Sequence, residues 1–182
     1  MITVISGTNR PNSKTRKVAG LVDILLQENG EEAVLLDLAE LPAEIFATSA
    51  YASKPASFTS FQHSVLESDG FLTVVPEYNG SFPGVLKYFI DMLRFPESLY
   101  EKPAAFVGIS AGRWGGLRAV EHLEMVFQYR NAHLFGRRCF IPGINKALDD
   151  TGQFTDPETV NRLRKTVLDF AGFCKRVGQA GP

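Results

Sequence analysis

Residues 76 to 84 read Pro76-Glu77-Tyr78-Asn79-Gly80-Ser81-Phe82-Pro83-Gly84, and this stretch separates a short apolar run from an amphipathic one. The run before it, residues 71–75, is FLTVV, and the run after it, residues 85–91, is VLKYFID. Prolines, glycines, an Asn and a Ser favour a loop. A short apolar run favours a buried strand, and apolar residues at helical spacing favour a helix. The stretch is therefore predicted to join the carboxyl end of a buried strand to a helix.

The same alternation of strand and helix extends over the rest of the chain. Apolar runs predict strands at 1–6, 33–36, 71–75 and 104–109, with a weaker one at 137–141. Helical spacing predicts helices at 15–29, 58–65, 85–93, 117–127 and from 157 onward. The last helix has a good start signal, with Asp156 as N-cap and Pro157 at its first position. Because the strands are continuously apolar, they belong in a parallel sheet covered on both faces. This pattern matches an α/β, flavodoxin-like three-layer sandwich, with a five-stranded parallel sheet of order 2-1-3-4-5.

Length and composition favour one soluble domain. The chain has 182 residues, 45% of them hydrophobic, and we expect a single domain over 1–177 with a frayed tail at 178–182. A net charge of −1 argues against nucleic-acid binding. No apolar run approaches a membrane span and no leader is evident, so we expect a cytoplasmic protein without a membrane partner. Cys139 and Cys174 form no metal-binding or redox motif, and we expect no metal site.

The loop after the first strand, residues 7–15, is predicted to bind a phosphate. Its sequence, GTNRPNSKT, leads into a helix N-terminus, where free N–H groups and the helix dipole favour an anion. The hydroxyls of Thr8, Ser13 and Thr15 can donate to phosphate oxygens, and Arg10 can pair with one. Residues 10–17 carry four basic side chains, and no acid occurs before Asp23. An ordinary capped helix with solvated charges stays open as the alternative.

The loops after the third and fourth strands suit a flat heterocycle. Tyr78 offers a ring for stacking, Asn79 a donor and an acceptor, and the turn at Gly80 free N–H groups. The later loop offers polar side chains and main-chain groups at Ser110, Gly112, Arg113, Trp114, Gly115 and Gly116. In the predicted sheet these loops and the phosphate loop meet in one crevice. A phosphate site beside a flat, hydrogen-bonding surface describes a pocket for FMN, and a purine nucleotide would fit less naturally.

All three loops resemble those of the NADPH-dependent FMN reductase family, which includes flavin, quinone, azo-dye and chromate reductases. The family's loops are similar to G-S-x-R-x-x-S-x-N, P-E-Y-N-x-S-x-P-G-x-L-K-N-x-I-D and S-x-G-x-x-G-G-x-R-A. The likeness extends from the first strand through the fourth helix. The resemblance implies three groups of binding residues: Gly7, Arg10, Ser13 and Thr15 for the phosphate, Pro76, Glu77, Tyr78 and Asn79 for the isoalloxazine ring, and Ser110, Gly112 and Gly115 for its pyrimidine edge. Tyr88 stands where the family usually has Asn, and no role for Tyr88 or Trp114 is implied.

The resemblance also implies the reaction. Hydride would pass from NADPH or NADH to FMN and then to a small-molecule electron acceptor, such as a free flavin, a quinone, an azo compound or a metal oxyanion, in a ping-pong sequence. The cofactor carries this chemistry, so we expect no catalytic side chain. We expect structural or surface roles for His63, His122 and His133, and a main-chain contribution from Glu77. The resemblance further implies a homodimer or homotetramer, with the irregular segment 37–56 as a candidate wall of the flavin site.

Two other functions stay open at this point. A flavodoxin-type electron carrier would bind FMN without reacting with NAD(P)H, but such carriers are usually strongly acidic. A flavin-binding sensor would keep the fold and bind FMN tightly without turnover. The preference between NADPH and NADH and the physiological acceptor are open as well.

Overall fold

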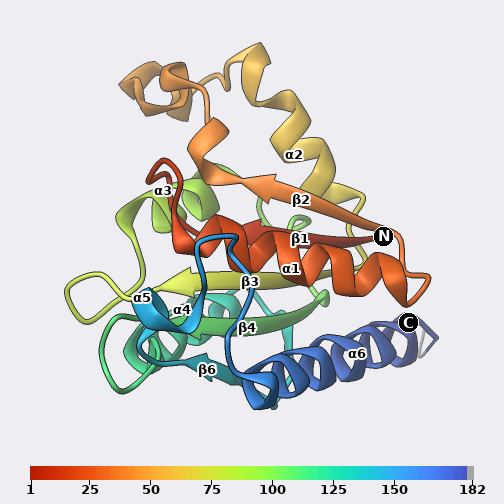
Figure 1. Ribbon diagram of the computed structural model, residues 1–182. Helices are drawn as coiled ribbons and strands as arrows, with labels where there is room; N and C mark the ends of the chain where they lie inside the picture. The colour runs from red at the N-terminus through yellow and green to blue at the C-terminus, as the bar shows by residue number, and fades with distance from the viewer. Residues whose placement is uncertain (180–182) are drawn as a thin grey trace.

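The computed structural model describes residues 1–179 and contains one parallel β-sheet between two layers of helices (Figure 1). The strands are β1 (Ile2–Ser6), β2 (Ala33–Asp37), β3 (Gly70–Pro76), β4 (Pro103–Ile109), β5 (His133–Leu134) and β6 (Cys139–Ile141). Their order is β2-β1-β3-β4-β5, and β6 also pairs with β4. Each pairing is parallel. The flavodoxin-like order predicted from the sequence is therefore confirmed.

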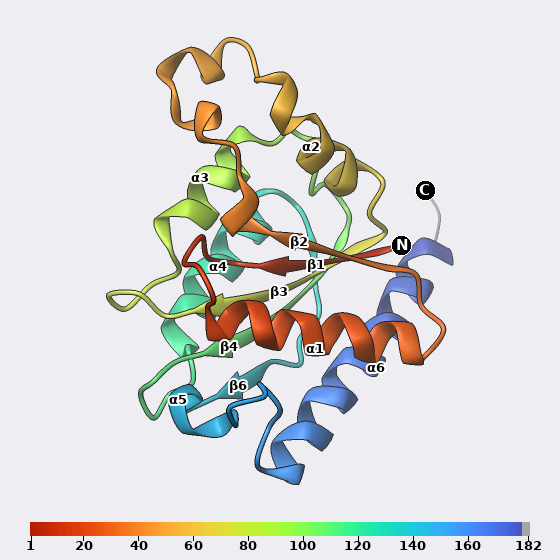
Figure 2. The same ribbon diagram turned by 45° about the horizontal axis from the view of Figure 1, so that its top comes forward.

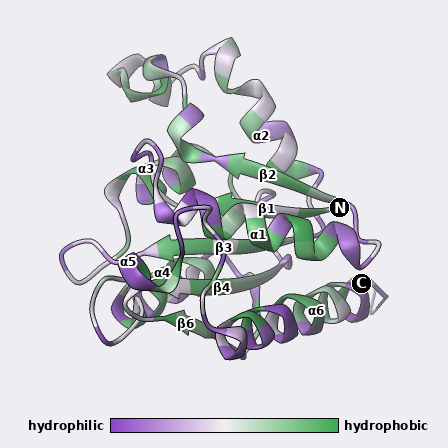
Figure 3. Cartoon of the chain, viewed as in Figure 1, coloured by the Kyte–Doolittle hydropathy of each residue, from purple (hydrophilic) through white to green (hydrophobic). Residues whose placement is uncertain are grey.

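Helices cover both faces of the sheet. They are α1 (Lys14–Glu28), α2 (Thr59–Leu66), α3 (Gly84–Met92), α4 (Leu117–Tyr129), α5 (Ile144–Ala147) and α6 (Pro157–Gln179). Helices α1 and α6 pack on one face, against Val4, Val74 and Val107, while α2, α3 and α4 pack on the other, against Ile5 and Phe106. Figure 3 shows the apolar strands enclosed between helices whose outer faces are polar. In the part of the chain that is described, no helix is long and apolar enough to span a membrane.

The fifth strand position differs from the expectation. One strand was predicted at 137–141, but two short strands share the place beside β4. β5 pairs with the start of β4, and β6 pairs with its end. Between them the pairing is interrupted at residues 136–138, after the Phe135 N–H donates to the Ala104 carbonyl of β4 at 2.8 Å. β6 still delivers the chain to the carboxyl edge of the sheet, next to β4.

Both ends of the last helix can be compared with the sequence. The predicted N-cap is confirmed, because Asp156 accepts hydrogen bonds from the backbone N–H groups of Glu158 (3.2 Å) and Thr159 (3.0 Å). At its other end α6 continues through Gln179, so its last two residues lie beyond the domain boundary expected at 177. Residues 180–182 of the expected tail lie outside the described part of the chain. Both cysteine thiols are buried, Cys139 in β6 and Cys174 on α6.

The segment between β2 and α2 is built from short 3-10 helices. They are η1 (Leu38–Glu40), η2 (Ala43–Phe46), η3 (Thr48–Tyr51) and η4 (Ala56–Phe58). The segment rises above the sheet edge beside α3 (Figure 2). Tyr88 of α3 holds it there, because its hydroxyl donates to the Ile45 carbonyl at 2.7 Å and its ring stacks on Phe46 at 4.9 Å between centroids. This contact gives Tyr88 a structural role that the sequence did not reveal.

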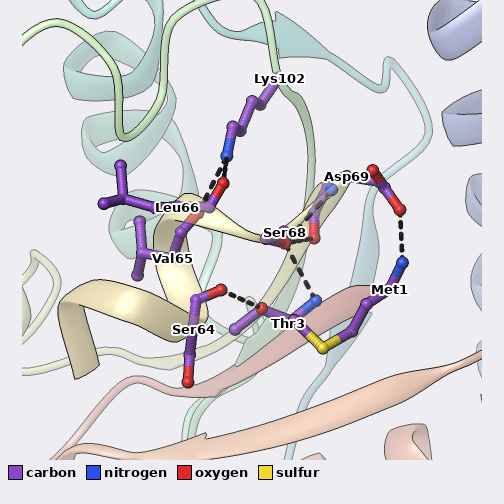
Figure 4. A network of polar contacts seen from close by, with 9 residues as sticks. Met1, Thr3, Ser64, Val65, Leu66, Ser68, Asp69 and Lys102 are labelled. Atoms are coloured by element: carbon purple, nitrogen blue, oxygen red, sulfur yellow. Dashed lines mark hydrogen bonds and ion pairs between the residues drawn. The ribbon is translucent and has the colours of Figure 1, made fainter. Parts of the chain in front are cut away.

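A polar network fixes the amino edge of the sheet, opposite the predicted crevice (Figure 4). Ser68 accepts from the Thr3 N–H at 3.3 Å and donates to the Gly70 carbonyl at 2.6 Å. The Lys102 ammonium donates to the last carbonyls of α2, those of Val65 (3.0 Å) and Leu66 (2.6 Å). Burial lowers the pKa of Lys102. These bonds connect β1, β3 and α2 at the amino edge. The loops that form the site follow the opposite, carboxyl ends of the strands.

Candidate functional site

The carboxyl ends of β1, β3 and β4 open into one crevice. All three strands point to the same edge of the sheet, where their loops gather (Figure 1). The crevice has a volume of about 770 Å³, within the ~300–1,000 Å³ typical of small-molecule sites. It is lined by Arg10, Pro11, Asn12, Ser13, Lys14, Thr15, Pro76, Glu77, Tyr78, Asn79, Ile109, Ser110, Ala111, Ile144 and Asn145.

The loop after β1 forms the end of the crevice that favours an anion. Ser13 is the N-cap of α1, and its side chain accepts from the Arg16 N–H at 3.1 Å. The hydroxyls of Ser13 and Thr15 are nearly buried, and the first turn of α1 holds no acidic residue. Hydroxyl donors, free N–H groups and a positive helix end therefore face the same space, which suits a phosphate.

The basic residues of this loop divide into two groups. Arg10 and Lys14 line the crevice. Arg16 instead pairs with Asp37 at the end of β2, at 3.2 Å, and Lys17 lies against Gly152. The sequence showed four clustered cations, but only two line the crevice. Those two are the candidates for neutralising a phosphate.

The loop after β3 begins with a tight turn. The main-chain N–H of Tyr78 donates to the Ser81 carbonyl at 2.7 Å, and the Ser81 N–H donates to the Tyr78 carbonyl at 3.1 Å. Asn79 and Gly80 both have positive φ, 52° and 75°, which is the pattern of a type I′ turn. The Tyr78 hydroxyl is 3.0 Å from Thr8 Oγ1. This contact joins the turn to the loop after β1.

The loop after β4 turns back against the sheet through its glycines. Gly115 has a φ of 60°, and a Cβ there would lie 2.8 Å from the Ile141 nitrogen. The loop's Ser110 faces the crevice, whereas Arg113 and Trp114 lie outside it, exposed and stacked at 5.0 Å. The close glycine packing keeps the main chain near the crevice and the two large side chains away from its lining.

Helix α5 contributes a wall that the sequence did not reveal. Its Ile144 and Asn145 line the crevice. The helix is fixed by the loop after β4, because the Ile144 N–H donates to Ser110 at 3.0 Å and the Gly143 N–H donates to Gly112 at 3.2 Å. A four-residue helix has no periodic signal in the sequence. Its residues reach the site because the pairing of β6 with β4 brings the chain there.

Eight of the fourteen residues predicted for FMN binding line the crevice: Arg10, Ser13, Thr15, Pro76, Glu77, Tyr78, Asn79 and Ser110. The other six do not line it: Gly7, Thr8, Gly80, Gly112, Arg113 and Gly115. Thr8 contacts the Tyr78 hydroxyl without lining the crevice. Gly7 packs against β3, where a Cβ would lie 2.9 Å from the Val74 carbonyl oxygen. Lining residues that were not predicted are Pro11, Asn12, Lys14, Ile109, Ala111, Ile144 and Asn145.

Glu77, which lines the crevice, carries a buried acceptor that no group in residues 1–179 satisfies. Among the described residues, Glu77 Oε2 is buried and has no hydrogen-bond partner. A buried acceptor without a partner is costly, and ligand sites are where such groups occur. With the anion end at α1 and the exposed Tyr78 ring, the donor set fits a flavin mononucleotide. These features define a flavodoxin-like fold with a flavin-type site.

Comparison with known proteins identifies the family. The sequence profile of the NADPH-dependent FMN reductases matches residues 1–147, and the chain belongs to this family. It is 34% identical over 152 residues to an NAD(P)H-dependent FMN reductase of Pseudomonas aeruginosa, with 81% of each chain covered. It is 29% identical over 180 residues to a quinone reductase of Escherichia coli, covering 97% of this chain and 96% of the relative.

A solved structure agrees with this assignment. The flavoenzyme NAD(P)H:(acceptor) oxidoreductase FerB of Paracoccus denitrificans superimposes with a TM-score of 0.81 at 26% identity, covering 96% of this chain and 97% of that one. The protein is therefore an NAD(P)H-dependent flavin enzyme whose cofactor is FMN.

Proposed function

We propose that the protein transfers reducing equivalents from NAD(P)H, through bound FMN, to a small diffusible acceptor such as a quinone or a free flavin, in a ping-pong sequence. The observation that carries the proposal is the meeting of the basic N-terminus of α1 and the Tyr78 turn in one open crevice. The relatives named as quinone and FMN reductases support the acceptor class. Azo compounds and metal oxyanions are further candidate acceptors.

The loop after β1 would hold the FMN phosphate. Ser13 and Thr15 offer hydroxyls, the first turn of α1 offers N–H groups, and Arg10 and Lys14 offer charge. Because Ser13, Thr15 and the N–H groups belong to the start of α1, binding a phosphate there would require little further ordering of the chain. Asn145 of α5 lines the same cavity and would bind the phosphate or the ribityl chain.

The Tyr78 turn and Ser110 would border the isoalloxazine ring. FMN, when bound, accepts hydride and passes it on, so the protein's task is binding, orientation and electrostatics. Tyr78 would stack at the ring edge, and Asn79 and Ser110 would form hydrogen bonds to it. The partnerless Glu77 Oε2 would accept from the N–H of the ring or from a hydroxyl of the ribityl chain, which adds a side-chain role to the main-chain one expected from the sequence.

The reaction site would be open to a second substrate. Tyr78 is 37% exposed and Asn79 is exposed, so one side of the crevice faces solvent. An open site lets the oxidised nicotinamide leave and an acceptor enter at the same place. Arg113, exposed in the loop after β4, is a candidate partner for the 2′-phosphate of NADPH.

A homo-oligomer is part of the proposal. Phe95, Met125 and Tyr129 are 66%, 59% and 79% exposed and lie along one groove between α3 and α4. Large apolar side chains gathered on a surface are typical of a subunit contact. On the other side of α3, the 37–56 segment presents exposed Phe46 and Tyr51 and is the candidate wall next to a second chain.

We also propose a cytoplasmic location, since the buried free thiols suit a reducing compartment.

The test begins with the visible spectrum of the purified protein with and without added FMN. NADPH is then added without oxygen, followed by a quinone. We expect bound flavin whose absorbance bleaches within seconds and returns on addition of the quinone. Flavin that NADPH does not bleach would identify an electron carrier or sensor instead, and absence of flavin binding at micromolar FMN would overturn the assignment of the crevice.

The oligomer is tested separately by sedimentation. We expect a dimer or tetramer for the intact chain. Deleting residues 41–53 should weaken both self-association and activity, and a deletion that affects neither would remove the segment from the proposed wall.

A further inference from the structure

The tip of the Tyr78 turn, at Asn79 and Gly80, has few packing contacts of its own, whereas Phe82 and Pro83 after it are packed. It projects beyond the sheet between β3 and α3, as the yellow-green loop at the left of Figures 1 and 2. Nothing lies within 4 Å of a Cβ built at Gly80 or Gly84. A projecting loop with little packing opens easily. The few bonds that hold it therefore decide where Tyr78 and Asn79 lie.

One of those bonds comes from a distant helix. His122 Nδ1 is 3.0 Å from Ser81 Oγ, and either group can be the donor, depending on the imidazole tautomer. His122 is half-buried on α4, whose Ala119, Leu123 and Phe127 are packed in the core. The contact therefore attaches the turn to α4, a helix that follows a different strand and is packed in the core.

Ser81 transmits this attachment to the residues that line the crevice. Its N–H and carbonyl both pair with Tyr78, at 3.1 and 2.7 Å. Tyr78 is held in turn by Thr8 on the opposite side, at 3.0 Å. The turn thus has one side-chain bond to the phosphate loop and one to α4. Removing the second would leave the Ser81 side chain without a partner and loosen the tip of the turn, while Phe82 and Pro83 still pack the chain that follows it.

We propose that His122 is a positioning residue for the reductase reaction, acting through Ser81 to hold the Tyr78 turn against the flavin. It does not line the crevice, so its effect on catalysis would pass through the turn. Because His122 also lines the groove proposed as a subunit contact, sedimentation of each variant must match the wild type. The sequence suggested a structural or surface histidine. This inference rests on the proposed function, because it assigns the turn to the isoalloxazine side of the crevice.

A double-mutant cycle tests the proposal. The variants are His122→Leu, Ser81→Ala and the double substitution. His122→Asn keeps a polar nitrogen near the position of Nδ1, and His63→Leu, an exposed histidine on α2, is the matched control. Each protein is measured for kcat and KM with NADPH and a benzoquinone, for its FMN dissociation constant, and for thermal stability. Amide hydrogen exchange at residues 78–81 is recorded without FMN.

The expected pattern is specific. His122→Leu and Ser81→Ala each lower kcat/KM about fivefold, the effect of losing roughly one net hydrogen bond. The double variant is no worse than either single one, because both remove the same contact. His122→Asn retains most of the activity, and His63→Leu matches the wild type. Exchange at residues 78–81 accelerates in His122→Leu while its melting temperature stays close to the wild type.

Three results would overturn the inference. They are multiplicative losses of kcat/KM in the double variant, unchanged kinetics in His122→Leu, and a loss of kcat/KM that occurs only in variants whose melting temperature is also lowered. These differ from failure of the proposed function, in which the wild type itself would not bind FMN or would not be reduced by NADPH. In that event the exchange data still decide whether His122 holds the turn, and unchanged exchange would refute it.

Discussion

The Tyr78 hydroxyl and Thr8 Oγ1 lie 3.0 Å apart and connect two of the three loops that form the crevice. Thr8 is fully buried, and its Oγ1 also accepts from the Arg10 N–H at 3.3 Å. One hydroxyl therefore holds both the flavin-side turn and the start of the phosphate loop. Thr8 supports the site although it does not line it.

This relationship predicts the effect of Tyr78→Phe. The ring remains, but the hydroxyl that binds Thr8 is lost, so the turn and the phosphate loop are no longer joined. We expect the FMN dissociation constant to rise about fivefold, as for one net hydrogen bond. Fluorescence titration of the apoprotein measures it. Tyr100→Phe, which removes an exposed hydroxyl elsewhere, is the control and should not change binding.

The division of the basic residues predicts that Arg10→Ala weakens FMN binding more than riboflavin binding. Riboflavin lacks the phosphate, so a side chain that pairs with the phosphate affects only FMN. We expect about a tenfold rise in the FMN dissociation constant, in line with a hydrogen bond to a charged group. Lys17→Ala, a cation that does not line the crevice, should leave both constants unchanged. Equal losses for both flavins would place Arg10 away from the phosphate.

The sheet and its loops could be read from the sequence because their signals are local. Apolar runs such as 71–75 and the Pro and Gly residues of 76–84 specify a strand and a loop without reference to other segments. The split fifth strand could not be read, because β5 and β6 are only two and three residues long and depend on pairing with β4. The 3-10 helices of 38–58 are too short to carry a helical stripe for the same reason.

The residues that line the crevice were predictable where their position follows from their own loop. Ser13 and Tyr78 are examples, since a helix N-terminus and a strand end position them. Arg16 is the opposite case, because its pairing with Asp37 depends on how β1 and β2 adjoin. Asn145 also reaches the site from another element, α5, and His122 of α4 contacts Ser81 of the turn beside it. Contacts between segments distant in sequence leave no mark on spacing or periodicity.

The anchoring of the 38–58 segment predicts the effect of Tyr88→Phe. The stacking on Phe46 is kept, but the hydrogen bond to the Ile45 carbonyl is lost. We expect faster cleavage by a nonspecific protease between residues 43 and 53, because local opening becomes easier. Timed digestion followed by mass spectrometry locates the cuts. An unchanged cleavage rate would mean that aromatic packing alone fixes the segment.

The N-cap of α6 predicts a contribution to stability that depends on pH. Hydrogen bonds from the Thr159 hydroxyl, and from the backbone N–H groups of Glu158 and Thr159, lower the pKa of Asp156 below its ordinary 3.8. The folded protein thus binds fewer protons than the unfolded chain between the two pKa values. The stabilisation is complete above the unfolded pKa and is lost as the pH falls through the folded one.

Asp156→Asn isolates this effect, since Asn still caps the helix but has no carboxylate to titrate. We expect the variant to be less stable than the wild type at pH 6, and the difference to begin to shrink as the pH is lowered below about 4. Urea unfolding between pH 3 and 7 gives both curves. Parallel curves across this range would contradict the assignment.

The close approach of the loop after β4 to its own strand predicts that Gly108→Ala destabilises the fold. A Cβ at Gly108 would lie 2.7 Å from the Gly115 carbonyl oxygen and 2.9 Å from Phe140 Cδ1. The first neighbour is main chain, so relief requires moving the loop that begins at Ser110. We expect a loss of about 1–3 kcal/mol, as for overpacking in a core. Gly136→Ala, where nothing lies within 4 Å of the new Cβ, is the matched control and should change stability little.

Since the displaced loop borders the crevice, Gly108→Ala should also weaken FMN binding under conditions where the protein remains folded. A stable variant with unchanged binding would show that the loop can move away from β4 without disturbing the site.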